Sequence, residues 1–262
     1  MGVTVAEQVQ ATAFVAAAAR AAETAKRGGR ISDDYAQRFV DAQEHGGAVR
    51  RRILAAGADE VVHRTVLLDA LLAAAVSGRE DYAVINLGAG FCARPYRLDL
   101  SGCRQYIEVD AAPVLDVKNR VLDGDEPSCP VHRVVGDVRD GEAIASIIAA
   151  HGLGSGHTIV LSEGLLVYLP AAEVTALARG LRTALASGRW LCDVVSVDSA
   201  AGMATVAGGA RAGVSLYGLA DLDVIEHGWS VTDYRPLPVS RRSPVPTSSR
   251  AVLDGVLALD TV

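Results

Sequence analysis

A short apolar strand with a glycine turn, followed by a second strand ending in an acid, constrains this chain most. The first apolar run leads into Gly88-Ala89-Gly90, and roughly twenty residues later a second run, Tyr106–Val109, ends at Asp110. Glycine lets the backbone turn tightly and approach a ligand where a Cβ would collide. A carboxylate at the tip of the next strand accepts hydrogen bonds from ribose hydroxyls. The pattern predicts a nucleoside-binding site on an open α/β sheet.

Composition excludes several classes of partner. The 262 residues are 50% hydrophobic and carry a formal net charge of −6, which argues against nucleic acid and anionic membranes as partners. Four scattered cysteines and six histidines lack metal-like spacing, so we expect no metal and no disulfide framework. The best apolar run, Val66–Val76, is too short to span a bilayer, and the start lacks a basic leader. We expect a cytoplasmic protein; its oligomeric state stays open.

The opening of the chain is predicted to be helical throughout. Helical patterns cover Val5 to about Lys26, Tyr35 to about Glu44 behind the capping pair Asp33-Asp34, and Ala48–Ala74. No strand pattern interrupts them. We therefore divide the chain into an N-terminal helical cap or lid, residues 1–80, and a core, residues 81–262.

Strands and helices alternate after the cap, which is typical of a parallel sheet covered on both faces. A helix is predicted from about Ala171 to Ala186, with a C-cap at Ser187-Gly188, and Ala200–Gly213 is interpreted as a loop. The last two strands lack a helix between them and predict an antiparallel finish. The fold class is therefore a doubly wound, Rossmann-like sheet of seven strands, predicted at Tyr82–Leu87, Gln105–Val109, His132–Val135, Thr158–Leu161, Trp190–Val195, Trp229–Tyr234 and Ala251–Ala258.

The glycine turn alone does not identify the nucleoside. Gly88 to Ala93 satisfies a dinucleotide fingerprint that nicotinamide, flavin and S-adenosylmethionine sites share. A pyrophosphate turn should open directly into a helix, whereas Pro95 disfavours helical geometry at the residue before it. A second acidic tip, Asp137-Val138, can contact adenine, although Asp137 could instead cap a helix beginning near Gly141. Two acidic tips fit an adenosine without phosphate, so we favour S-adenosylmethionine.

Several of these segments resemble the leucine carboxyl methyltransferase family. The resemblance covers roughly residues 30 to 195, and the Ser-Glu-Gly-Leu block is its most specific part. It lies in Ser32–Tyr35, Val62–Thr65, Val84–Phe91, Arg94–Leu98, Glu108–Asp110 with Lys118, Gly136–Val138 and Ser162–Leu169. The wider family includes bacterial enzymes that methylate carboxyl groups of polyketide products. Two departures are Cys92-Ala93, where the family often has Asp-Thr, and Ser32, where eukaryotic members have a lysine.

The resemblance implies a role for each matched residue. Arg64 is expected to reach the carboxylates in the active site, as both a cofactor-binding and a substrate-binding residue. Apart from the resemblance, Tyr35 and Tyr168 are candidate pocket residues, with a buried core position as the alternative, and Tyr168 and His63, which is beside Arg64 in the sequence, join Arg64 as catalytic candidates. The glycine turn, the two acidic tips and the acid after the fourth strand imply S-adenosylmethionine binding by Gly88, Ala89, Gly90, Asp110, Asp137, Val138 and Glu163.

Functions from three classes remain, and an O-methyltransferase is favoured. We expect it to methylate a carboxylate of a small molecule, for which an arginine clamp suffices, with S-adenosylhomocysteine as the second product. Base-assisted methylation of a hydroxyl generally needs a positioned base, and the sequence offers no convincing Asp–His pair for that role. The second class is a nicotinamide-dependent oxidoreductase, and the third is a non-catalytic S-adenosylmethionine-binding protein.

Overall fold

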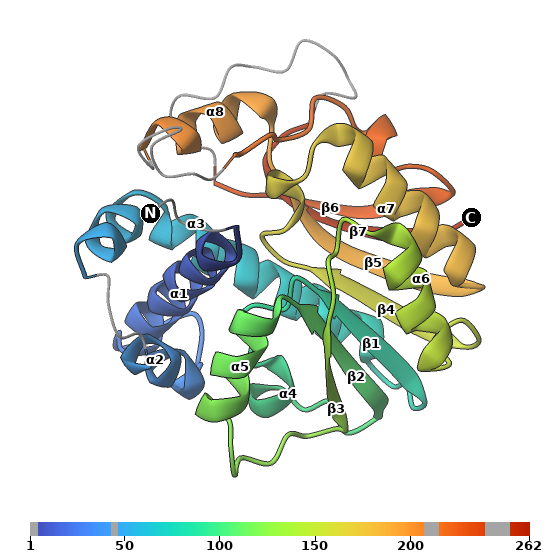
Figure 1. The fold of residues 1–262 in the computed structure, drawn as a ribbon, viewed down its shortest axis with the longest axis horizontal. Coiled ribbons are helices and arrows are strands. Elements are labelled where there is room, and N and C mark those ends of the chain that lie inside the picture. The colour runs from blue at the N-terminus through green and yellow to red at the C-terminus, as the bar shows by residue number, and fades with distance from the viewer. Residues whose placement is uncertain (1–4, 43–46, 207–214, 239–251) are drawn as a thin grey trace.

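The computed structural model describes residues 5–42, 47–206, 215–238 and 252–262. A single sheet forms the centre, with helices on both of its faces, and the N-terminal helices lie together beside its β1–β3 half (Figure 1). The order is β3-β2-β1-β4-β5-β7-β6; strands β1 to β5 are parallel, and β7 pairs antiparallel with both β5 and β6. The strands are β1 (Tyr82–Leu87), β2 (Cys103–Asp110), β3 (Val131–Val135), β4 (His157–Ser162), β5 (Ser187–Val194), β6 (Trp229–Pro236) and β7 (Gly255–Thr261).

The predicted fold class is confirmed, including the seven strands and the antiparallel finish. Each residue of β1 is buried, which explains why the central strands are apolar without alternation. The helices are α1 (Val5–Thr24), α2 (Asp34–Asp41), α3 (Gly47–Val76), α4 (Arg94–Arg97), α5 (Ala112–Val121), α6 (Gly141–Ala150), α7 (Ala171–Ala184) and α8 (Val197–Val206), with 3₁₀ turns η1 (Leu166–Tyr168) and η3 (Leu222–Val224).

Two hydrophobic cores lie on opposite faces of the sheet. Helices α6 and α7 pack through residues such as Ile144 and Leu177 against Ile85 and Val160. Helix α3 covers the other face, where residues around Leu68 contact Val84 and its neighbours. The long α3 therefore joins the N-terminal region to the sheet rather than standing apart from it.

The glycine turn itself anchors the N-terminal helices. The ring of Phe91, directly after the turn, stacks on Phe39 of α2 with ring centroids 4.8 Å apart. Phe14 of α1 meets the same ring edge-on at 4.7 Å. The buried cluster continues to Val114 of α5. The boundary predicted at residues 80–81 falls between α3 and β1, and the division into a cap and a core stays a prediction.

Two local predictions were wrong. Helix α7 ends at Ala184, and Ser187 and Gly188 are the first residues of β5, where a Cβ added to Gly188 would lie 3.0 Å from the Thr158 carbonyl oxygen. Gly188 therefore allows β5 to approach β4 closely and does not cap a helix. The segment from Ala200 is helical to Val206, because alanines favour helix and Gly202 costs only about 1 kcal/mol. The rest of that predicted loop lies outside the described residues.

A buried acid ties the end of α1 to the loop that follows it. Glu23 accepts bonds from Lys26 Nζ at 2.5 Å and Arg30 Nε at 2.8 Å. These bonds lower the pKa of Glu23 from 4.5 to about 2, and the bond from Arg30 has the largest effect. A lowered folded-state pKa stabilises the protein above the unfolded-state pKa, and this contribution is lost as the pH falls from 4.5 towards 2.

Replacing Glu23 by glutamine should therefore lower Tm at pH 7 by several degrees, since each kcal/mol is worth roughly 2–4 °C in a domain of this size. The variant should also lose less stability than the wild type between pH 4.5 and pH 2. Glu126→Gln, at an exposed loop position, is the control. If Glu23→Gln and Glu126→Gln had the same Tm at each pH in this range, the ionised Glu23 carboxylate would not stabilise the fold.

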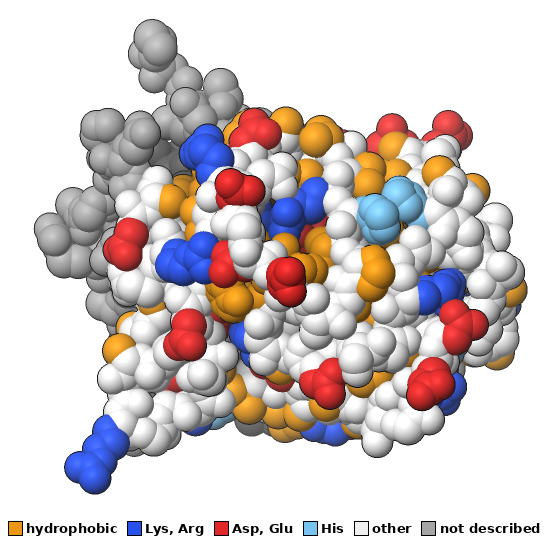
Figure 2. Space-filling model, turned by 90° about the horizontal axis from the view of Figure 1, so that it is seen from below, with side chains coloured by type: hydrophobic (Ala, Val, Ile, Leu, Met, Phe, Trp, Pro, Cys, Tyr) orange, Lys and Arg blue, Asp and Glu red, His pale blue; other side chains and the backbone are white. Residues whose placement is uncertain are grey.

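The exterior carries charges of both signs. On the face seen in Figure 2, Lys and Arg side chains alternate with Asp and Glu side chains, and neither sign gathers into a continuous patch. Among the described helices, none is both long and apolar enough to cross a membrane.

Candidate functional site

The carboxyl ends of five strands lie along one edge of the sheet, and an acid or a glycine lies at each of them. Strands β1 to β5 are parallel, so their carboxyl ends point the same way. This edge brings together Gly88, Asp110, Gly136, Glu163 and Asp193. Open α/β sheets bind ligands outside the carboxyl ends of their strands, at the switch in strand order, which here lies between β1 and β4.

The glycine turn needs glycine for two separate reasons. Gly88 has a φ of +64° and Gly90 a φ of +46°, values that residues with a Cβ rarely adopt. A Cβ on Gly88 would also lie 3.1 Å from Leu165 Cδ1, so the backbone and the turn after β4 approach closely. The predicted role of these glycines in shaping the turn agrees with this geometry.

The amides of the turn are occupied by the protein. Gly88 and Ala89 donate to the Val109 carbonyl at 2.9 and 3.1 Å, and Gly90 donates to Asp110 Oδ2 at 2.7 Å. A pyrophosphate-binding turn presents such N–H groups to the phosphates instead. The donor set therefore suits a nucleoside without phosphate, which is the fit expected for S-adenosylmethionine.

The expectation that Pro95 keeps the preceding residue, Arg94, out of a helix was wrong. The turn does open into a helix, the single turn α4, with Arg94 as its first residue and Ala93 as its N-cap. Proline fits the first turn of a helix because the N–H it lacks has no helical partner there. The case against a dinucleotide rests on the occupied amides and not on Pro95.

Asp110 is better placed for a ribose than Glu108. Asp110 accepts backbone N–H bonds from Gly90 and Ala111, both at 2.7 Å, which leaves one lone pair on each oxygen for a diol. Burial raises the pKa of Asp110, and the two N–H bonds oppose that rise. Glu108 is instead paired with Lys118 Nζ at 2.6 Å and with Arg133 Nε at 2.9 Å. Glu108 is therefore a structural ion-pair residue.

The turn after β3 lies beside Asp110, since Gly136 donates its N–H to the Asp110 carbonyl at 3.1 Å. Val138 packs at the margin of the core. Asp137 is half exposed, and its carboxylate pairs with Arg139, whose hydrogen bonds lower the pKa of Asp137. Asp140, not Asp137, caps the helix that follows, so the capping alternative for Asp137 is wrong.

Glu163 lies at the centre of a buried polar cluster. Its Oε1 accepts from the Thr65 hydroxyl at 2.6 Å and lies 3.5 Å from Arg64 Nε. Its Oε2 pairs with Arg94 Nη2 at 2.7 Å. Burial alone would raise the pKa of Glu163, but the Arg94 and Arg64 guanidinium groups outweigh burial and hold it well below its ordinary value. Glu163 is therefore an anion throughout the physiological range.

Arg64 lies between two acids at one end of this cluster. Its Nη1 is 3.4 Å from Asp193 Oδ2, and its side chain is only 11% exposed. Gly164 flanks the guanidinium so closely that a Cβ there would lie 2.8 Å from Arg64 Nη2. Both ion-pair distances exceed the 2.7–2.9 Å typical of a charge-assisted hydrogen bond, so the guanidinium keeps donor capacity for a further anion.

Sequence reasoning missed most of the charges that support this cluster. Asp69 accepts from Arg94 at 2.7 Å and from Arg97 at 2.6 Å, linking α3 to α4. Asp69 and Asp193 each interrupt an apolar run, and an acid in such a run is costly unless paired. That signal was available. The complete series alternates in sign along an ionic chain from α1 to β5: Arg20, Asp33, Arg97, Asp69, Arg94, Glu163, Arg64 and Asp193.

Tyr168 lies near enough to Arg64 for the charge of Arg64 to act on it, whereas the contacts of His63 and Tyr35 are with other residues. The Tyr168 hydroxyl bonds the Thr12 side chain, and burial raises its pKa while Arg64 opposes the rise. His63 is on the outer side of α3, 2.9 Å from Arg30 Nη1 and 3.4 Å from Asp59. Tyr35 packs against the Tyr96 ring at 5.5 Å, in a separate surface depression.

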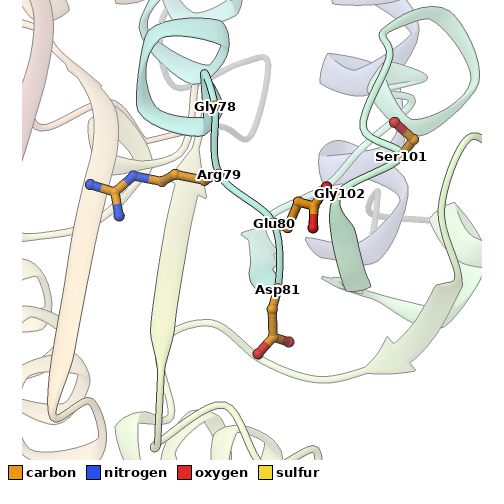
Figure 3. A pocket seen from close by; sticks show the side chains of 6 residues that line it. All are labelled: Gly78, Arg79, Glu80, Asp81, Ser101 and Gly102. Atoms are coloured by element: carbon orange, nitrogen blue, oxygen red, sulfur yellow. The ribbon is translucent and has the colours of Figure 1, made fainter.

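A second depression lies at the edge of the sheet formed by the amino ends of the parallel strands, opposite the edge described above. It is lined by the turn before β1, Gly78 to Asp81, and by Ser101 and Gly102 before β2 (Figure 3). Arg79 points away from the other labelled side chains in this view. The amino ends of parallel strands are not where such sheets bind cofactors, so this depression is no candidate for the nucleoside.

The sequence of the chain matches a known protein family. The profile of the leucine carboxyl methyltransferase family matches residues 13–182, more than half of the chain. A Mycobacterium tuberculosis protein, provisionally named an S-adenosyl-L-methionine-dependent methyltransferase, is 37% identical over 180 residues, 63% of this chain. Those residues span 57% of the length of that relative.

Solved structures share the fold. A DUF574 family protein from Streptomyces avermitilis has a TM-score of 0.63 at 13% identity, with 96% of this chain and 97% of that chain covered. Magnesium protoporphyrin IX methyltransferase from Synechocystis, crystallised with S-adenosylhomocysteine, has a TM-score of 0.51 at 14% identity, with 86% and 94% covered. The predicted cofactor is thereby confirmed at the level of the family. This chain belongs to the leucine carboxyl methyltransferase family.

Proposed function

We propose that this chain is an S-adenosylmethionine-dependent O-methyltransferase that esterifies a carboxylate of a small molecule, such as a polyketide-type product. The observation that carries the proposal is the buried Arg64 guanidinium, held loosely at 3.5 and 3.4 Å between two acids at the edge where the cofactor residues meet. A planar, permanently charged fork with spare donors suits a carboxylate better than a hydroxyl.

Each cofactor-binding residue has a distinct task in this proposal. Gly88, Ala89 and Gly90 form the surface on which the nucleoside lies, and Asp110 accepts from the ribose hydroxyls. Asp137 and Val138 border the adenine, which requires Asp137 to exchange its Arg139 contact for the base. Glu163 and Arg64 face the amino acid end of the cofactor, since they offer one charge of each sign.

The chemistry asks little of the protein beyond orientation. When bound, S-adenosylmethionine supplies an electrophilic methyl group on a sulfonium centre. A carboxylate with a pKa near 4 is already ionised at neutral pH, so no general base is needed. Arg64 then orients the acceptor, and Tyr168, which packs against the buried cluster of Val167, Val195 and Ala200, borders it. The N-terminal helices, tied to the glycine turn through Phe91, exclude water.

Turnover with a panel of paired acceptors tests the proposal. Aliphatic and aromatic carboxylic acids are compared with the corresponding amides, alcohols and phenols, and S-adenosylhomocysteine formation is measured. We expect turnover of at least one acid and of none of its partners. The rate should stay nearly flat from pH 6 to 8, and fall only towards acid, where burial raises the pKa of Asp193 and Asp110.

Selective turnover of a phenol or an alcohol would contradict carboxylate specificity. A rate that titrates near pH 6.5 and collapses in His63→Ala would assign a histidine base instead. Binding of S-adenosylhomocysteine without turnover of any acceptor would favour a non-catalytic binding protein.

Replacing Asp110 by alanine tests the ribose contact separately. The change should weaken S-adenosylhomocysteine binding by about 1–3 kcal/mol, because it removes the acceptor of two hydroxyls in a partly buried site. Calorimetric titration measures the affinity, and Asp116→Asn, exposed on α5, controls for the lost charge. Equal affinity of Asp110→Ala and the wild type would show that the ribose binds elsewhere.

A further inference from the structure

Asp193 is a buried acid for which neither the sequence motifs nor the predicted roles account. It lies one residue before the end of β5 and is only 3% exposed. A carboxylate buried to this degree is unfavourable unless both oxygens find partners. Its Oδ1 accepts the N–H of Gly164 at 2.5 Å, and its Oδ2 faces Arg64 Nη1 at 3.4 Å. One side chain therefore touches both the turn after β4 and the acceptor clamp.

The turn after β4 is shaped to the same guanidinium. Gly164 has a φ of +63°, and the atoms nearest to a Cβ added there are Nη2, Cζ and Nη1 of Arg64, at 2.8, 3.1 and 3.3 Å. Glu163, the preceding residue, faces Arg64 Nε at 3.5 Å. The guanidinium is thus bordered on Nε by Glu163, on Nη1 by Asp193 and on Nη2 by Gly164.

The two acids hold Arg64 in unequal ways. Glu163 has stronger partners in Thr65 at 2.6 Å and Arg94 at 2.7 Å, so its position is fixed independently of Arg64. Asp193 has no second cation among the ion pairs of the described residues, and its other bond goes to a backbone amide. The orientation of the planar Arg64 guanidinium about its Cδ–Nε bond therefore depends chiefly on Asp193.

We propose that Asp193 is a positioning residue that fixes the plane of the Arg64 guanidinium against the Gly164 turn, and with it the orientation of the acceptor carboxylate. The inference rests on the proposed function, since it concerns the acceptor that Arg64 binds. Asp193 acts through Arg64 and does not touch the reacting atoms.

The test compares Asp193→Asn, Asp193→Glu, Arg64→Lys and the double variant Asp193→Asn with Arg64→Lys, using the best acid from the acceptor panel. Asp193→Asn should raise KM for the acid and lower kcat/KM by about 10- to 100-fold, the range in which misorientation of a reactant acts. Asp193→Glu, which keeps the charge, should recover part of the loss. In the Arg64→Lys background the same Asp193 change should have little further effect, because residues that act together are non-additive.

Two readouts do not depend on turnover. Calorimetry should show that Asp193→Asn lowers the S-adenosylhomocysteine affinity far less than it lowers kcat/KM for the acid, because Glu163, held by Thr65 and Arg94, still faces the amino acid end of the cofactor. Proton exchange at Arg64 Nε–Hε, followed by NMR in the S-adenosylhomocysteine complex, should be markedly faster in Asp193→Asn. Asp260→Asn is the matched control, because Asp260 also pairs with an arginine, Arg189, at 2.7 Å, but at the side of the sheet distant from the glycine turn.

Additive effects of the two substitutions, or unchanged Arg64 Nε–Hε exchange, would overturn the positioning role and leave the proposed function standing. A kcat that collapses at constant KM, without rescue by glutamate, would also overturn it and identify Asp193 as a base. If no acid in the panel is turned over, the proposed function fails first. Should Asp193→Asn not fold, Gly164→Ala displaces the same guanidinium at Nη2 and must show the same KM effect.

Discussion

Replacing Gly88 by valine should abolish binding of S-adenosylhomocysteine. A β-branched residue at a φ of +64° is strained by about 1–3 kcal/mol, and its Cβ would start only 3.1 Å from Leu165 Cδ1. The remaining valine atoms would occupy the surface on which we place the nucleoside. Calorimetric titration measures the loss, and circular dichroism checks that secondary structure is retained.

Gly124 provides the matched control for this prediction. It has a similar φ, +79°, but no atom lies within 4 Å of an added Cβ. Gly124→Val therefore carries the backbone strain without the steric conflict, and it should bind S-adenosylhomocysteine normally. If Gly88→Val retained the affinity of Gly124→Val, the glycine turn would not be the cofactor surface.

Replacing Arg64 by lysine should lower kcat/KM for the acceptor by about 10- to 100-fold, although the charge is retained. A lysine ammonium is a point charge that cannot hold a carboxylate through two parallel N–H bonds, and it cannot reach Glu163 and Asp193 from one plane. Steady-state kinetics with the best acid from the panel measure the effect.

His63→Ala is the comparison for Arg64→Lys, because His63 precedes Arg64 but contacts Arg30 and Asp59 on the outer side of α3. It should change kcat/KM far less. A larger loss in His63→Ala than in Arg64→Lys would contradict the guanidinium clamp and return His63 to the catalytic role that the sequence suggested.

The sheet and the glycine turn could be predicted because their causes are local. Buried parallel strands are apolar along their length, and a backbone at positive φ selects glycine, so β1 and Gly88 are visible in the sequence. Pro95 was misjudged because its effect depends on its place within a helix, and α4 places it in the first turn.

The ionic chain could not be predicted because its partners are distant in the sequence. Arg64 and Asp193 are 129 residues apart, and Arg64 and Glu163 are 99 apart. Nothing local pairs them; only the parallel order of β4 and β5 and the crossing of α3 bring them together. The sequence does mark each acid as unusual by its apolar neighbours, and that signal indicates burial without naming the partner.

The chemical class of the methylated product decides whether the acceptor is a carboxylate or a hydroxyl. The protein is incubated with methyl-labelled S-adenosylmethionine and an accepted substrate, and the isolated product is treated with mild base. A methyl ester hydrolyses and releases the label as volatile methanol, whereas a methyl ether retains it. We expect complete release of the label as methanol; a base-stable methylated product would show that the acceptor is not a carboxylate.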